Sequence, residues 1–121
     1  LCFAAIGTDT GGSIRYPAMA NGVTGLKPTY GRVSRHGVLA LAESLDHVGP
    51  MARSVADAVA LYNAITGYDE NDQTSLNRED AQIAQPAATS LNGLRLGVDA
   101  DWFSHGTDPG LLAALEQAVG V

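Results

Sequence analysis

The feature that most constrains the fold of this chain is a stretch unusually rich in glycine. Seven glycines fall between residues 7 and 37. Glycine loses more conformational freedom on folding than any other residue, so this density is unfavourable unless the backbone turns sharply or approaches something closely. Pro17 and Pro28 also disfavour a long helix in this region. We therefore predict loops and short strands over residues 7–50.

Around this stretch the pattern predicts an α/β fold. The apolar residues 3–8 predict a buried strand that leads into the glycine-rich loop, and residues 23–26 predict a second strand. Gly49-Pro50 is expected to close the loop region. Ser54 as N-cap, apolar residues spaced three and four apart, and Gly67 as a C-terminal stop predict a helix.

The second half of the chain predicts fewer elements. Residues 68–90 are polar and are interpreted as a surface excursion or linker rather than part of an active site. Residues 91–121 predict a strand at 94–98 and then a helix that Asp108 caps and Pro109 opens. Alternation of strands and helices is typical of α/β domains.

Charge and composition exclude several classes of partner. The net charge is −6, and residues 61–121 hold nine acidic residues against two basic ones. Because an acidic surface repels phosphate, we expect no direct contact with nucleic acid. No apolar run approaches the roughly 20 residues of a membrane-spanning helix, so no membrane partner is expected. The single Cys2 suits a reducing, cytoplasmic location, and its apolar neighbours indicate a buried, inert thiol.

The triplet Gly11-Gly12-Ser13 admits three interpretations from the residues alone. A phosphate-binding loop of the Walker type needs a lysine before the serine, and none is present. A nucleophilic serine between small residues, with adjacent backbone N–H groups for an oxyanion, remains open. So does a plain tight turn, which is the commonest use of such residues.

Longer motifs add a family resemblance. Residues 7–15, Gly-Thr-Asp-Thr-Gly-Gly-Ser-Ile-Arg, resemble the core motif of the amidase signature family. The similarity continues densely through residues 21–35 and 44–55 and more loosely beyond. It implies that the chain is an internal fragment of a single catalytic domain, with residues 1–55 as the motif region. It also implies a mixed central sheet flanked by helices. The start at Leu1 without Met agrees with this expectation.

The resemblance also implies a mechanism. Members of this family cleave carboxylic amides with a serine nucleophile, a second serine in a cis peptide and a lysine. The motif places the nucleophile on Ser13 and the oxyanion hole on the backbone N–H groups of Thr10, Gly11, Gly12 and Ser13. The second serine and the catalytic lysine belong to upstream motifs that this chain lacks, and Lys27 lies in a different motif. We therefore expect this chain alone to be inactive, with a small carboxamide as substrate and no metal or cofactor.

Other polar residues near the motif receive structural interpretations. Asp9 and Arg15 flank the nucleophile, and we predict that they pair and support the loop, although two solvated charges are an equal alternative. Tyr16 and Met19 are interpreted as apolar packing, with the lining of an acyl pocket as the alternative. Asp46 is expected to be a turn or cap residue, and its neighbour His47 is not assigned as a base.

Three functional interpretations remain open. The first is a stand-alone amidase, and the second is the amidase subunit of a tRNA-dependent amidotransferase that works with a partner subunit. The third is a non-catalytic relative that serves as a binding or structural module. The sequence leaves a homo-oligomer open and does not identify the amide.

Overall fold

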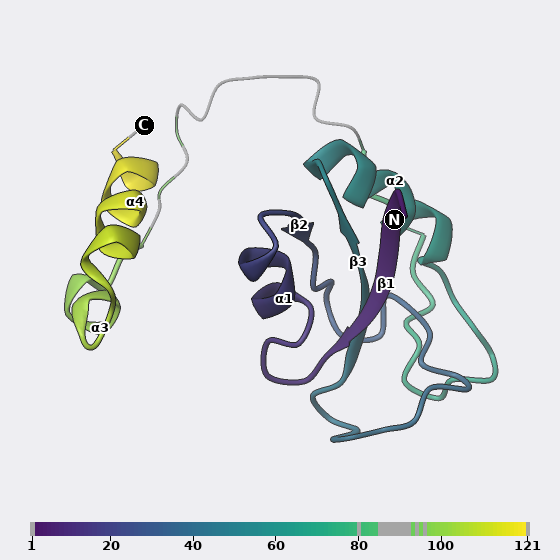
Figure 1. Cartoon of the computed structure of the whole chain (residues 1–121). Coiled ribbons are helices and arrows are strands. Elements are labelled where there is room, and N and C mark those ends of the chain that lie inside the picture. The colour runs from purple at the N-terminus through teal and green to yellow at the C-terminus, as the bar shows by residue number, and fades with distance from the viewer. Residues whose placement is uncertain (1, 80, 85–92, 94, 96, 121) are drawn as a thin grey trace. The chain divides into compact units, whose positions relative to one another are not determined.

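The computed structural model describes residues 2–79, 81–84, 93, 95 and 97–120. It divides into two compact units, Leu1–Ala87 and Ala88–Val121, which are described separately (Figure 1). The predicted α/β class is confirmed, because a small sheet and helices make up the first unit. None of the helices in the described ranges is long and apolar enough to cross a membrane.

The first unit is built on a three-stranded antiparallel sheet. Its strands are β1 (Ala4–Asp9), β2 (Thr24–Gly25) and β3 (His47–Ala52), in the order β1-β3-β2. The strands predicted at residues 3–8 and 23–26 are therefore present. The expected burial of the first is wrong, since half of the residues of β1 are exposed, only Asp9 is buried, and Phe3 just before the strand is 87% exposed. β1 lies at an edge of this sheet, and among the described residues no strand pairs with its outer side.

The central strand β3 is absent from the sequence-based prediction, because Gly49-Pro50 was interpreted as the close of a loop. Pro50 lies inside this strand, opposite Ile6 of β1. Its carbonyl accepts the N–H of Leu26 at 3.0 Å. In an antiparallel strand the N and the carbonyl of one residue face the same neighbour, so the missing N–H of Pro50 faces the Leu26 side, where β2 has already ended. No hydrogen bond to β1 is lost.

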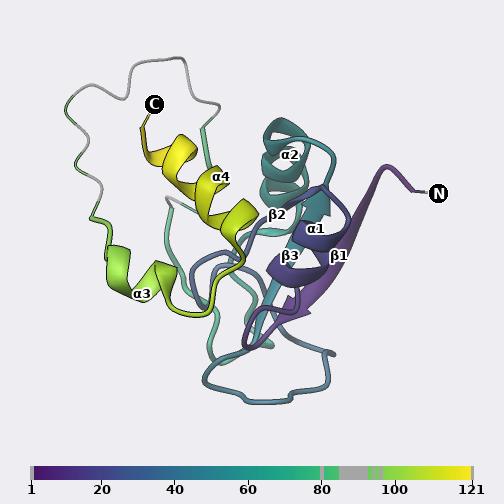
Figure 2. The same cartoon turned by 60° about the vertical axis from the view of Figure 1, so that its left-hand side comes forward.

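Two helices lie on opposite faces of this sheet, with α1 forward in Figure 2. Helix α1 (Arg15–Ala20) was not predicted, and Pro17 fits because the N–H groups of a first helical turn need no partner within the helix. Its face meets the glycines of the sheet: a Cβ on Gly49 would lie 3.1 Å from Ile14, and one on Gly25 2.7 Å from Ala18. The glycines therefore permit α1 to approach the strands closely.

The opposite face of the sheet carries helix α2 (Val55–Ile65). Its predicted N-cap is confirmed, because Ser54 accepts the N–H of Asp57 at 3.1 Å. Val33, Val48 and Tyr62 form a buried apolar cluster between this helix and the sheet. Residues at alternate positions of β3 therefore serve two faces, one packed on α1 and one on α2.

The second unit contains helices α3 (Ala100–Ser104) and α4 (Pro109–Val119). The predicted cap of α4 is confirmed, since Asp108 accepts the N–H of Gly110 at 2.8 Å. Helix α3 was not predicted, and the apolar face expected on α4 is not buried. The predicted strand 94–98 includes Leu94 and Leu96, which lie outside the described residues.

Candidate active site

Ser13 lies in the loop that joins β1 to α1, and its side chain is exposed between two buried neighbours, Gly12 and Ile14. Gly12 has φ +139°, and a Cβ there would collide with the ring of Tyr16. This position therefore requires glycine both for its backbone conformation and for space. The loop holds Ile14 in the core and turns Ser13 outward.

Asp9, the last residue of β1, fixes the conformation of this loop through its carboxylate. Its carboxylate is fully buried and accepts the N–H groups of Gly12 at 2.7 Å and Ile14 at 3.2 Å. The guanidinium of Arg15 donates to both carboxylate oxygens, each at 3.0 Å. These donors, Arg15 first among them, hold the pKa of Asp9 far below its ordinary value, against the opposing effect of burial. The pairing of Asp9 with Arg15 expected from the sequence is thus present.

The hydrogen bond from the Gly12 N–H to Asp9 involves one of the predicted oxyanion donors. Four backbone N–H groups were predicted from the motif, those of Thr10, Gly11, Gly12 and Ser13. The N–H of Gly12 is already bonded to Asp9. Thr10, Gly11 and Ser13 are the other members of the predicted set.

Ser13 faces a pocket of about 580 Å³. The pocket is lined by parts of residues 8–10, Tyr30, residues 35–48 and residues 71–74, together with Ser13 itself. Segments distant in the sequence therefore meet in front of the serine. Its lining includes hydroxyl, amide, imidazole and carboxylate groups beside an apolar stretch at residues 38–41.

Asp46 connects two sides of this pocket. Its Oδ1 accepts a short hydrogen bond from the hydroxyl of Thr10, and its Oδ2 accepts the N–H groups of Leu41 at 2.8 Å and Ala42 at 3.0 Å. The Thr10 hydroxyl is the main reason that the pKa of Asp46 is lowered. The expected turn role of Asp46 is confirmed by its two backbone contacts, whereas no pattern in the sequence indicates the link to Thr10.

His47 lines the pocket, but its contacts are structural. Its Nδ1 bonds the carbonyl of Leu45 at 2.6 Å, and its ring meets Tyr30 edge-on at 5.6 Å between centroids. Because a carbonyl only accepts, Nδ1 carries the hydrogen here. The ammonium of Lys27 donates to the carbonyl of Pro28 at 2.9 Å. The Lys27 contact agrees with not assigning this lysine as the base.

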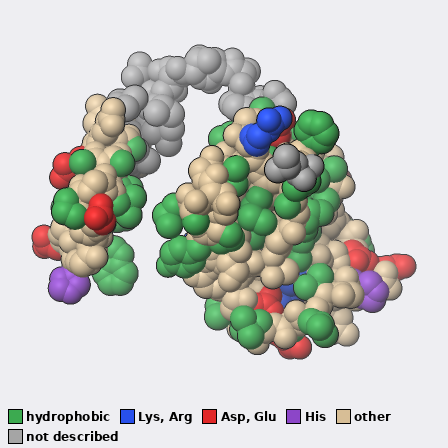
Figure 3. Space-filling model, viewed as in Figure 1, with side chains coloured by type: hydrophobic (Ala, Val, Ile, Leu, Met, Phe, Trp, Pro, Cys, Tyr) green, Lys and Arg blue, Asp and Glu red, His purple; other side chains and the backbone are tan. Residues whose placement is uncertain are grey.

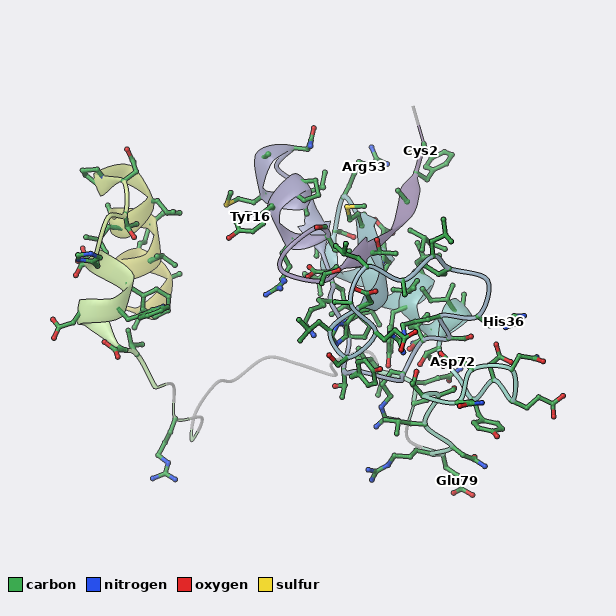
Figure 4. The ribbon with its side chains drawn as sticks, turned by 90° about the horizontal axis from the view of Figure 1, so that it is seen from below. Cys2, Tyr16, His36, Arg53, Asp72 and Glu79 are labelled. Atoms are coloured by element: carbon green, nitrogen blue, oxygen red, sulfur yellow. The ribbon has the colours of Figure 1, made fainter. Side chains whose placement is uncertain are left out.

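Residues 71–74 line the pocket, which corrects the interpretation of residues 68–90 as a surface excursion or linker rather than part of an active site. Asp72 is buried and accepts the backbone N–H of Arg35 at 2.8 Å, and the hydroxyl of Thr74 accepts from the Arg35 guanidinium at 2.9 Å. Figure 4 shows Asp72 beside the loop that carries His36. Aspartate, serine and threonine often bond nearby backbone in turns, and their density at 69–75 could have indicated an ordered segment.

Tyr16 and Met19 do not fulfil their predicted packing role, because both are exposed. Figure 4 shows Tyr16 pointing outward from α1. Cys2 is likewise exposed rather than buried. All three lie outside the pocket of Ser13.

Known proteins resemble the chain over its whole length. The family model described as Amidase matches residues 1–121. The chain is 50% identical over 119 residues to the A subunit of glutamyl-tRNA(Gln) amidotransferase from Methylobacillus flagellatus, covering 98% of this chain and 24% of that protein. The chain spans about a quarter of the length of the curated relatives it matches.

Solved structures agree. The A subunit of glutamyl-tRNA(Gln) amidotransferase from Thermotoga maritima has a TM-score of 0.62 at 56% identity, covering 64% of this chain and 17% of that one. The native peptide amidase of Stenotrophomonas maltophilia has a TM-score of 0.58 at 49% identity, covering 73% and 17%. Sequence and structure lead to one conclusion: this chain belongs to the amidase family, whose members include the amidase signature enzymes.

Proposed function

We propose that this chain supplies the nucleophile of an amide-hydrolysing enzyme, and that Ser13 is that nucleophile. The observation that carries the proposal is the placement of Ser13: it is exposed, it faces a pocket, and its loop is held by a fully buried carboxylate. A serine held in this way can approach a carbonyl without rearrangement of its own loop.

In the proposed reaction, Ser13 Oγ attacks the amide carbonyl carbon and forms a tetrahedral oxyanion. The C–N bond then breaks, the nitrogen leaves as ammonia or an amine after taking up a proton, and water hydrolyses the seryl ester to a carboxylate. A base must remove the hydroxyl proton. The resemblance implies a second serine and a lysine for that purpose, and we propose that both lie in parts of a longer polypeptide.

The oxyanion would be bound by backbone N–H groups of residues 10–13. We propose Thr10, Gly11 and Ser13 as the main donors, with Gly12 able to contribute only if it shares its hydrogen with Asp9. Removing one such donor typically lowers the rate on the order of a hundredfold or more. Asp9 and Arg15 are proposed as supporting residues, because they hold the loop from which these donors project.

The experiment uses a polypeptide that contains residues 1–121 at the full length of the curated relatives, called the full-length form below. We expect it to release ammonia from a simple carboxamide without metal or cofactor, and to be labelled by a fluorophosphonate. Ser13→Ala should abolish both activities while the protein remains folded. Ammonia release or labelling that persisted in Ser13→Ala would exclude Ser13 as nucleophile.

A second candidate function is the amidase subunit of a tRNA-dependent amidotransferase. The observation in its favour is that curated relatives 48–51% identical are named as the A subunit of glutamyl-tRNA(Gln) amidotransferase. The acidic residues 61–121 make this segment a poor RNA-binding surface, so we propose that any tRNA contact lies elsewhere or on a partner subunit. Either function is compatible with the proposed cytoplasmic location.

The two candidates differ in what the full-length form needs. A stand-alone amidase releases ammonia from a simple carboxamide with no partner and no tRNA. An amidotransferase subunit supplies ammonia for the amidation of glutamyl-tRNA, a step that requires its partner subunit and an activated carboxyl group on the tRNA-bound glutamate. A full-length form that lacked both activities and resisted the fluorophosphonate would instead be the non-catalytic relative.

A further inference from the structure

The loop of Ser13 and the wall of its pocket are joined at the end of the sheet. The last residue pair of the β1–β3 ladder is Asp9 opposite His47. The next residue outward on one side is Thr10, and on the other it is Asp46, and their side chains are hydrogen-bonded. The bond therefore continues the pairing one step beyond the ladder, where the two segments diverge.

The two carboxylate oxygens of Asp46 accept hydrogen bonds from two different segments, the nucleophile loop and residues 41–42. One accepts from Thr10, three residues before Ser13, and the other accepts from the backbone of Leu41 and Ala42. The residue is 6% exposed, and a buried carboxylate is unfavourable unless donors compensate it. Three donors do so here. Because they come from both segments, neither segment can shift without loss of a hydrogen bond to a charged group.

Asp46 holds the segment of residues 38–42 through the backbone of Leu41 and Ala42, and this segment forms the apolar part of the pocket. Leu39 is 98% exposed and Leu41 is 83% exposed, and both line the same pocket as Ser13. Large aliphatic side chains held open in a pocket fit an apolar portion of a ligand. The hydrogen bonds of Asp46 thus fix the position of this apolar wall relative to the nucleophile loop.

We infer that Asp46 is a positioning residue: through Thr10 it holds the nucleophile loop against residues 38–42, and so sets where the apolar acyl group of an amide lies relative to Ser13. This inference rests on the proposed function. It assigns no proton transfer to Asp46, which touches loop residues rather than the reacting atoms. A small misplacement of reacting groups can lower a rate greatly, so the effect should appear in turnover.

The test compares Thr10→Val, Asp46→Asn and the double variant in the full-length form. Turnover is measured per active site labelled by a fluorophosphonate, on two amides that differ only in the length of an unbranched acyl chain. Thr10→Val keeps the side-chain shape and removes the hydroxyl. We expect each single variant to lower kcat by about tenfold, the size of one lost hydrogen bond to a charged group, and to change the preference between the two amides. The kcat of the double variant should be no lower than the kcat of the less active single variant.

Two variants serve as references. Thr10→Ser keeps the hydroxyl and should restore most of the kcat lost in Thr10→Val. Asp57→Asn is the control, because Asp57 also accepts a hydroxyl, from Ser54 at 2.7 Å, but neither Asp57 nor Ser54 lines the pocket. It should leave kcat per labelled site and the amide preference unchanged.

Wild-type kcat per labelled site in Thr10→Val, or losses that multiply in the double variant, would overturn the inference. So would an unchanged preference between the two amides, which would reduce Asp46 to a structural role that affects only the number of labelled sites. Failure of the proposed function looks different: the wild-type full-length form would itself show neither ammonia release nor labelling.

Discussion

Single residues set the geometry of the nucleophile loop, and Asp9 holds most of it. Its buried carboxylate meets backbone N–H groups on both sides of Ser13, and Arg15 covers it from the solvent side with a bidentate contact. Removing one partner of such an arrangement leaves donors without an acceptor, which is more damaging than the absence of the whole network.

Asp9→Asn should therefore weaken both stability and activity. An amide offers one acceptor oxygen and no charge, so several donors of Gly12, Ile14 and Arg15 lose their partner. We expect a loss on the order of 2 kcal/mol in the free energy of unfolding, and a lower kcat, in urea titration and ammonia release of the full-length form. Asp57→Asn, an exposed residue at the start of α2, is the control. Unchanged stability together with unchanged turnover in Asp9→Asn would contradict the supporting role.

The same residue predicts a dependence on pH. The pKa of Asp9 lies far below its ordinary value of 3.8, because Arg15 and backbone donors favour the ionised form. The stabilisation by Asp9 should then be complete above the unfolded-state pKa and be lost as pH falls through the lower folded-state value. The difference in unfolding free energy between wild type and Asp9→Asn should thus be constant at neutral pH and shrink once pH drops below about 4. A difference in unfolding free energy that grew on acidification would contradict this prediction.

The helices and strands differ in how well the sequence alone predicts them. The caps at Ser54 and Asp108 were predictable because a cap and its N–H donor lie within three residues of each other. Strand β3 was not, since Pro50 is acceptable there only because its missing N–H faces Leu26, far away in the chain, rather than β1. The pocket wall at residues 71–74 was missed for the same reason, as Asp72 meets Arg35 37 residues away.

The approach of α1 to the sheet gives a prediction at this scale. A Cβ on Gly49 would overlap the carbonyl oxygen of Leu26 and would lie 3.1 Å from Ile14. The contact with backbone cannot be relieved by a side-chain rotation. Gly49→Ala should therefore destabilise the full-length form by about 3 kcal/mol or more in urea titration. Gly97→Ala is the control, since nothing lies within 4 Å of its Cβ. Equal stability of the two variants would show that the backbone at Leu26 can move away from β3.

At the scale of the whole molecule, the chain exposes much apolar surface. Figure 3 shows hydrophobic side chains spread over the visible face of the first unit. In the second unit Trp102 is exposed and no residue of α4 is buried. Monomeric soluble proteins rarely expose large apolar patches. The curated relatives are about four times longer than this chain, and we propose that the remainder of such a polypeptide covers these residues.

The isolated 121-residue chain should accordingly differ from the full-length form. We expect it to bind a hydrophobic dye strongly, to self-associate in sedimentation, and to release no ammonia from carboxamides. The full-length form should show weak dye binding and measurable turnover at the same molar concentration. Weak dye binding by the isolated chain would show that its apolar residues are already covered.

The hydrogen bond between Thr10 and Asp46 also has a consequence for folding kinetics. These residues are 36 positions apart, so the chain must close a long loop before the bond can form. Contacts of this separation form slowly compared with helical turns. Helix α2 can begin locally at Ser54, whereas the surroundings of Ser13 form only after β3 has paired with β1. In refolding experiments we therefore expect reactivity of Ser13 to return only after the helical signal has recovered, which makes it a late reporter of the native state.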